Sequence, residues 1–161
     1  MLRMSKKAEY ALMALKDLAS RQETGAASAR EIAERYEIPL ELMAKVLQRL
    51  TRQRLLTSHH GTRGGYHLAR SASRISVADV IEAIAGPVTV TVCSSLADDC
   101  DQHDTCNIRE PLWRIRDQIV RALTAYSIQA LVSDESPTVS ISMGRRSPDQ
   151  GLPLVQVESG H

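Results

Sequence analysis

Aromatic residues are scarce in this 161-residue chain: they make up 3% of it, and phenylalanine is absent altogether. The core must therefore be built from Leu, Ile, Val, Ala and Met, a composition that favours packed helices over a sheet sandwich. Long hydrophobic runs are also missing, since no stretch approaches the roughly 20 consecutive apolar residues of a membrane span. The basic N-terminus lacks a long apolar segment and a small-residue cleavage site, so we expect a cytoplasmic protein without a secretory signal.

The net charge of the chain is only +1, but the charges are unevenly distributed. Residues 1–92 carry 14 Lys or Arg and 9 Asp or Glu, a net charge of +5, whereas residues 93–110 carry one and five, a net charge of −4. A basic N-terminal region favours a polyanionic partner, and the acidic segment would be held away from that partner. The length of the chain leaves room for one compact domain and an appendage.

Helical periodicity divides the first third of the chain into three segments. Residues 5–20 place their apolar side chains on one helical face. Ser28 and Glu31 have the spacing of a capping box, which predicts a short helix over residues 29–36. Residues 40–53 form a further amphipathic segment with a polar outer face. Two short helices joined by a tight turn, the second with a polar face, predict a helix-turn-helix.

The next segment has the pattern of a β-hairpin. Residues 55–58 and 66–68 predict two short strands, and residues 59–65 between them are rich in glycine. A hairpin directly after a helix-turn-helix is the wing of a winged helix. Residues 77–86 predict another helix that ends at a Gly-Pro pair. The expected fold class is therefore mainly α, with a winged helix-turn-helix DNA-binding domain over residues 1–87.

All three cysteines of the chain follow this domain in one short polar stretch. Cys93, Cys100 and Cys106 alternate with acidic residues and one histidine, namely Asp98, Asp99, Asp101, His103 and Asp104. Buried structural cysteines are scattered among apolar neighbours, and an odd count argues against a purely structural disulfide framework. The stretch, residues 88–107, is therefore predicted to be a loop that holds a metal centre and reports on iron–sulfur or redox state.

Apolar residues recur at spacings of three and four after the last cysteine. They predict one long helix over residues 108–132 that dimerises with a second copy of the chain. The alternative is that this helix docks onto the N-terminal domain of its own chain. Residues 133–161 are rich in Ser, Pro and Gly without periodicity, which predicts a disordered tail.

The sequence resembles the Rrf2 family of bacterial transcription regulators over residues 4–130. The resemblance rests on SKKAEYAL at residues 5–12, IPLELM at 38–43, GTRGGY at 61–66, Leu112-Trp113 and the three cysteines. It implies a homodimer that binds palindromic operator DNA, most commonly as a repressor. It also implies an iron–sulfur cluster ligated by the three cysteines, with a labile fourth position that suits a sensor of iron, oxygen or nitric oxide.

The fourth cluster ligand differs between subgroups of that family. IscR-like members have a histidine shortly after the third cysteine, but Asn107 follows Cys106 here. NsrR-like members use a carboxylate on the first helix of the partner subunit, and Glu9 falls at that position. We therefore favour Glu9 as the fourth ligand. The alternative ligands are His103 and the four aspartates of the loop. In that case Glu9 would be a solvated helix residue paired with a nearby lysine. This ligand set leans towards a 4Fe–4S cluster, and a 2Fe–2S cluster is the other possibility.

The expected DNA contacts come from the second helix of the helix-turn-helix and from the wing. The N-terminal residues of a recognition helix reach base edges in the major groove, where Glu41 can accept from cytosine and Lys45 can reach guanine or phosphate. An arginine between glycines suits a narrow minor groove. For each of these residues the other interpretation is a solvated surface. The candidate contacts are Pro39, Leu40, Glu41, Ala44, Lys45 and Arg49 in the helix, and His60 and Arg63 in the wing.

Other functions are compatible with the same residues. The cysteines could form a disulfide on oxidation and act as a thiol switch without a cluster. Three thiolates with His103 could bind zinc. The chain could also be a regulatory module that binds an enzyme rather than DNA. We do not expect an enzyme, because the acidic loop weakens a thiolate nucleophile and no glycine loop for phosphate precedes a helix.

Overall fold

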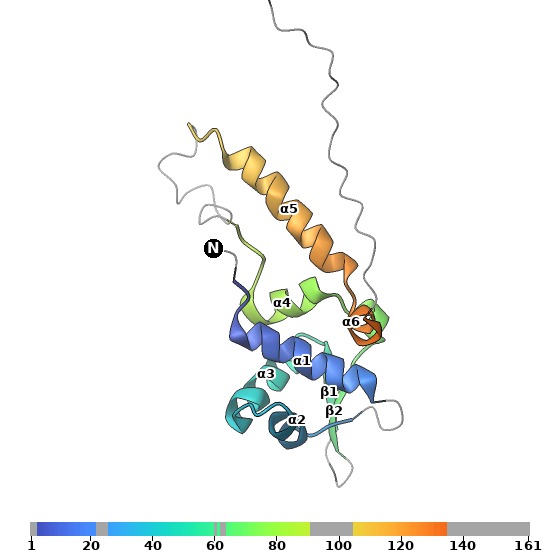
Figure 1. The fold of residues 1–161 in the computed structure, drawn as a ribbon. Helices are drawn as coiled ribbons and strands as arrows, with labels where there is room; N and C mark the ends of the chain where they lie inside the picture. The colour runs from blue at the N-terminus through green and yellow to red at the C-terminus, as the bar shows by residue number, and fades with distance from the viewer. Residues whose placement is uncertain (1–2, 22–25, 60, 62–63, 91–104, 135–161) are drawn as a thin grey trace, which may run out of the picture.

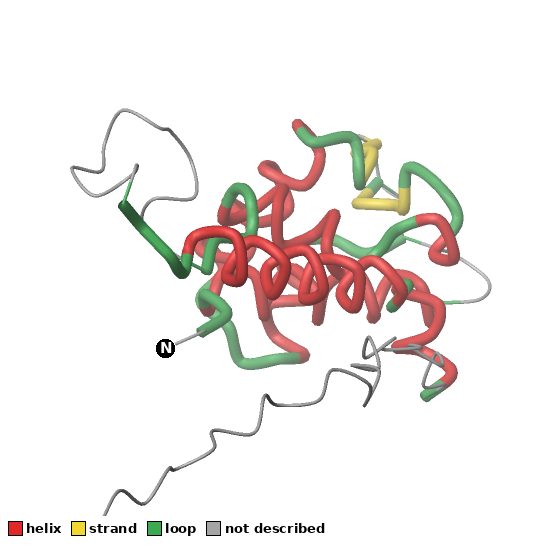
Figure 2. Tube along the Cα trace, turned by 90° about the horizontal axis from the view of Figure 1, so that it is seen from above, coloured by secondary structure: helices red, strands yellow, loops and turns green. Residues whose placement is uncertain are grey.

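The computed structural model describes residues 3–21, 26–59, 61, 64–90 and 105–134. Most of these residues are helical, and two short strands lie at the edge of the helical body (Figures 1 and 2). The mainly helical architecture and the small antiparallel sheet agree with the expected fold class. The elements are α1 (Lys6–Ser20), α2 (Ala29–Arg35), α3 (Leu40–Arg52), β1 (Leu56–His59), β2 (Gly65–Leu68), the 3-10 turn η1 (Ala72–Arg74), α4 (Val77–Ala85), α5 (Arg109–Ala125) and α6 (Ile128–Ser133).

Local capping interactions explain where α2 and α4 begin. The Glu31 N–H donates to Ser28 Oγ at 3.2 Å, and the Ser28 N–H donates to Glu31 Oε2 at 2.6 Å. Ser76 and Asp79 make the same reciprocal pair at the start of α4, at 3.1 and 2.9 Å. These bonds satisfy N–H groups that a helix end leaves without intrahelical partners. The capping box predicted at α2 is therefore confirmed.

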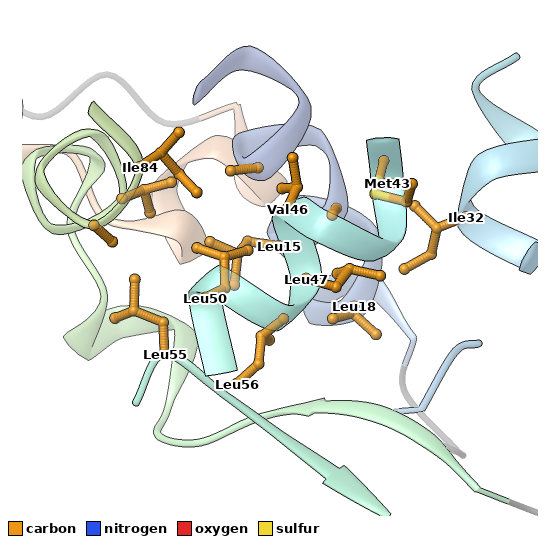
Figure 3. Close-up of a cluster of buried hydrophobic side chains, with 14 of the residues drawn as sticks. Leu15, Leu18, Ile32, Met43, Val46, Leu47, Leu50, Leu55, Leu56 and Ile84 are labelled. Carbon is orange, nitrogen blue, oxygen red and sulfur yellow. The ribbon is translucent and has the colours of Figure 1, made fainter. Parts of the chain in front are cut away.

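Helix α3 runs through the hydrophobic core (Figure 3). Its buried stripe packs against aliphatic side chains of α1, α2, α4 and β1, and full burial of each such side chain contributes about 1.5–3 kcal/mol. This stripe fixes the rotation of α3 about its own axis, so the polar face of the helix must point outward. The α3 stripe consists of Met43, Val46, Leu47 and Leu50.

The hairpin expected after α3 is present: β1 is shifted by one residue from the predicted bounds, and β2 begins one residue earlier than predicted. β1 and β2 are antiparallel, with Leu56 opposite Leu68 and His59 opposite Gly65. Ala27 lies along the other side of β2, where the Tyr66 N–H donates to the Ala27 carbonyl at 2.8 Å. A Cβ atom on Gly65 would meet the Ala27 backbone at 2.9 Å, so this close approach requires glycine. The wing is thus fastened to the segment that leads into α2.

The single helix expected over residues 108–132 is instead two helices. α5 ends at Ala125, and the Ser127 hydroxyl accepts a hydrogen bond from the first turn of α6. Ile128 is fully buried, and its N–H donates to the Ile75 carbonyl at 2.8 Å. α6 therefore packs against α1 and η1 of its own chain (Figure 1). For this last segment, docking onto the N-terminal domain is the correct alternative.

Several predicted features lie outside the described residues. They are Cys93 and Cys100 with most of the cysteine loop, His60 and Arg63 in the wing, and the tail from residue 135. Of the helices that are described, none is long and apolar enough to cross a lipid bilayer.

Candidate nucleic-acid interface and cysteine segment

The N-terminal half of α3 presents the predicted contact residues at the surface. Pro39, Leu40, Glu41 and Lys45 are exposed, and Ala44 is half-buried. Leu40, the first residue of α3, is 42% exposed. No side chain caps the N-terminus of α3, and the Leu42 N–H in its first turn donates to the Pro39 carbonyl at 3.0 Å.

Glu41 and Lys45 lie one helical turn apart on this surface. Neither makes an ion pair with any other residue that the structure describes. Both side chains are therefore available to an incoming duplex, the carboxylate as an acceptor and the ammonium as a donor. The structure places both residues and Leu40 at the exposed surface of α3, and their contact with DNA stays a prediction.

Arg49 has a partner that the sequence did not reveal. Its Nε donates to the carbonyl oxygen of Ala83 in α4 at 2.9 Å. The guanidinium group thus bridges the recognition helix and α4. Contact of Arg49 with the DNA backbone stays a prediction.

A buried carboxylate holds the helix-turn-helix against α1. Asp17 is 1% exposed, and its oxygens accept from Arg21 Nε at 2.8 Å, Arg35 Nη1 at 2.7 Å and the Tyr36 hydroxyl at 3.3 Å. Burial, followed by the nearby carboxylate, raises the pKa of Tyr36 above its ordinary value. Sequence reasoning missed this network, which joins Asp17 to Arg35 and Tyr36, 18 and 19 positions further along the chain.

Glu9, the favoured fourth cluster ligand, lies on the exposed side of α1. Its Oε2 is 2.6 Å from Lys6 Nζ, and its side chain is 40% exposed. The hydrogen bond and the charge of Glu9 raise the pKa of Lys6 above its ordinary value. Within one chain, Glu9 is therefore paired with a lysine at a partly exposed position, as in the alternative interpretation of this residue. Its role as a ligand for a cluster shared with a second chain stays a prediction.

Cys106 is a half-buried free thiol that lies just before α5. Within the described part of the chain, no three His, Cys, Asp or Glu side chains are grouped as metal ligands, and Cys93 and Cys100 fall outside that part. The prediction of a three-cysteine centre therefore stays a prediction. In the sequence, the three cysteines lie between α4 and α5.

Helix α5 leaves an apolar surface uncovered. It contains no buried residue, and three large apolar side chains on or just before it are markedly exposed. The guanidinium carbon of Arg109 lies 5.6 Å from the centroid of the Trp113 ring, a cation–π distance. The exposed apolar residues are Ile108 at 57%, Trp113 at 39% and Ile115 at 46%.

Comparisons with known proteins by sequence and by fold both give transcription regulators. Residues 4–134 match the Rrf2 family, described as iron-dependent transcriptional regulators. The HTH-type transcriptional regulator ORF2 of Azotobacter vinelandii is 33% identical over 95% of this chain and 93% of its own length. The HTH-type transcriptional regulator IscR of Photorhabdus laumondii is 33% identical over 83% of this chain and 81% of its own.

Among solved structures, CymR, titled the global cysteine regulator of B. subtilis, superposes with a TM-score of 0.68. It is 26% identical and covers 84% of this chain and 100% of its own. The relatives are transcription regulators rather than enzymes, which confirms the expectation that this chain is not an enzyme. The chain belongs to the Rrf2 family of DNA-binding transcription regulators.

Proposed function

We propose that this protein is a transcriptional repressor whose DNA binding depends on an iron–sulfur cluster and responds to iron–sulfur, redox or nitric oxide status. The observation that carries the proposal is the position of the cysteine segment. It is inserted between α4, which packs on the recognition helix, and α5, which presents an uncovered apolar surface. A change in this segment would reach both the DNA-binding domain and the surface for a second copy.

The ligands in this proposal are Cys93, Cys100 and Cys106, completed by Glu9 of a second copy. Three thiolates are the donor set that iron–sulfur clusters use, and a carboxylate in the fourth position gives a labile site. The half-exposed Glu9 and the half-buried Cys106 fit this role, because neither is sealed inside the core. When bound, the cluster would supply a redox-sensitive cross-link; its nuclearity would be 4Fe–4S or 2Fe–2S.

The functional unit in this proposal is a cytoplasmic homodimer on palindromic DNA. Two copies of α5 would bury exposed apolar side chains of this helix, among them Ile115. The two recognition helices would then enter successive major grooves, a geometry that tolerates little change in spacing. Glu41 and Lys45 would read base edges, while His60 and Arg63 of the wing would contact the backbone and the minor groove.

Operator binding under anaerobic conditions tests this function. Duplexes would be selected from a random pool with the cluster-loaded and the cluster-free protein, and affinities measured by fluorescence anisotropy. We expect the two forms to differ at least about fivefold in operator affinity, a modest coupling by the standards of regulated proteins. Cys93→Ala and Cys106→Ala should abolish the difference, whereas Lys45→Ala should weaken binding in both forms. Unchanged state dependence in the cysteine variants contradicts the proposal.

A second function is a thiol-based regulator without a cluster. It is favoured by the free Cys106 thiol and by the likeness to the cysteine regulator CymR. In that case operator affinity would change on treatment of metal-free protein with a disulfide-forming oxidant, and a reductant would reverse the change. A response that requires iron and sulfide distinguishes the first function from the second.

A further inference from the structure

The end of α4 contains a backbone carbonyl that its own helix cannot satisfy. The oxygen of Ala83 would normally accept from the N–H four residues later, but that residue is Pro87, which has no N–H. Ala83 is 7% exposed, so water is largely excluded. Arg49 supplies the missing donor through Nε at 2.9 Å.

The charge of Arg49 suits this position as well. The last turn of α4 contains no basic residue, and the carbonyl end of a helix carries partial negative charge. Gly86, with φ +87°, ends the helix, and the chain continues through residues 87–90 towards Cys93. The contact is therefore at the turn of α4 nearest to the cysteine segment.

Helix α4 is also packed between the recognition helix and α5. Ile84 of α4 belongs to the same buried cluster as Val46 and Leu50 of α3 (Figure 3), and the other neighbour, α5, begins shortly after Cys106. Beside the C-terminal turn of α4 is a cavity of about 300 Å³ lined by Met4, Ala85 to Val88 and Leu123. Arg49 would carry a shift of the end of α4 to α3.

We propose that Arg49 is a positioning residue that couples the state of the cysteine segment to the recognition helix through α4. This inference rests on the proposed state-dependent DNA binding. It assigns Arg49 a role distinct from phosphate contact, and the two roles require different properties of the Arg49 side chain. Coupling requires an N–H donor at the ε position, whereas phosphate contact requires the positive charge.

Two substitutions separate these requirements. Arg49→Gln places an amide N–H the same number of bonds from the backbone as Nε and removes the charge. Arg49→Met has the same length with neither donor nor charge. Arg52→Met is the matched control, because Arg52 lies three residues further along α3, is exposed, and makes no hydrogen bond or ion pair with other described residues.

The measurement is the ratio of operator affinities of the cluster-loaded and cluster-free full-length chain, together with the salt dependence of binding. Arg49→Met should reduce the ratio at least about fivefold, Arg49→Gln should retain most of it, and Arg52→Met should leave it unchanged. Circular dichroism melting would confirm that each variant is folded. Retention of the ratio in folded Arg49→Met, with a salt slope smaller by about one, makes Arg49 a phosphate contact and overturns the inference. A wild-type ratio of one overturns the proposed function itself.

Discussion

Asp17 of α1 and Arg35 of α2 form an ion pair at 2.7 Å that fastens the helix-turn-helix to the first helix. The carboxylate is buried, but the Arg35 side chain is 57% exposed, so water solvates part of the cation. The carboxylate is therefore the member of the pair that depends on its protein partners, which include Arg21 and Tyr36.

Removal of the Asp17 charge should destabilise the fold. We expect Asp17→Asn to lower the free energy of unfolding by about 2 kcal/mol, because charged hydrogen bonds to two arginines are lost. Urea unfolding followed by circular dichroism measures the effect. Glu110→Gln is the control, since its pair with Arg114 is exposed on both sides and should contribute less than about 1 kcal/mol. Equal losses in the two variants would contradict the structural role of Asp17.

The capping box of α2 should make stability depend on pH. The Ser28 N–H donates to the Glu31 carboxylate and holds the pKa of Glu31 below its ordinary value of 4.5. A lowered pKa in the folded state contributes stability above the unfolded value, and this contribution is lost as the pH falls through the folded value. The stability advantage of the wild type over Glu31→Gln should therefore shrink below about pH 4.5. An advantage that stays constant between neutral and acidic pH in urea unfolding would argue against this effect.

The docking of α6 should be essential to the stability of the DNA-binding domain. Ile128 is fully buried, so Ile128→Ala should lower the free energy of unfolding by about 2–4 kcal/mol through lost burial and the cavity left behind. Gln129→Ala, at an exposed neighbouring position, should change it by less than about 0.5 kcal/mol. If Ile128→Ala unfolds at the same urea concentration as Gln129→Ala, α6 is not part of the core.

The uncovered surface of α5 should mediate dimerisation. Ile115→Glu introduces a charge into that apolar surface and should raise the dimer dissociation constant at least about a hundredfold, which corresponds to about 3 kcal/mol. Thr124→Glu places the same charge half a turn away around the helix and should leave the dimer intact. Sedimentation velocity gives the oligomeric state of each variant. A stable Ile115→Glu dimer would show that the interface lies elsewhere.

Features coded by neighbouring residues were predictable from the sequence. The Ser28–Glu31 capping box and the end of α4 at Gly86 each depend on residues within one turn of each other. The exposed half of α3 followed from the spacing of its apolar residues, because the buried stripe leaves Glu41 and Lys45 on the outer face.

Features that depend on distant contacts were not predictable. The apolar spacing continues through Ser127, so nothing local shows that the chain bends there and that Ile128 packs beside Ile75. The bond from Arg49 to Ala83 joins residues 34 positions apart. Both features depend on how α3, α4 and the C-terminal helices pack. The spacing of apolar residues indicates which face of a helix is buried, but not which distant element packs against that face.

The most direct test of the central claim is the absorption spectrum of the anaerobically purified chain, with iron and acid-labile sulfide measured on the same sample. The account predicts a brown protein with visible charge-transfer bands and matched iron and sulfide. It also predicts loss of these bands in Cys93→Ala, Cys100→Ala and Cys106→Ala, and a more labile or altered cluster in Glu9→Ala. A colourless protein that resists cluster reconstitution, whether it contains zinc or no metal, would contradict the account.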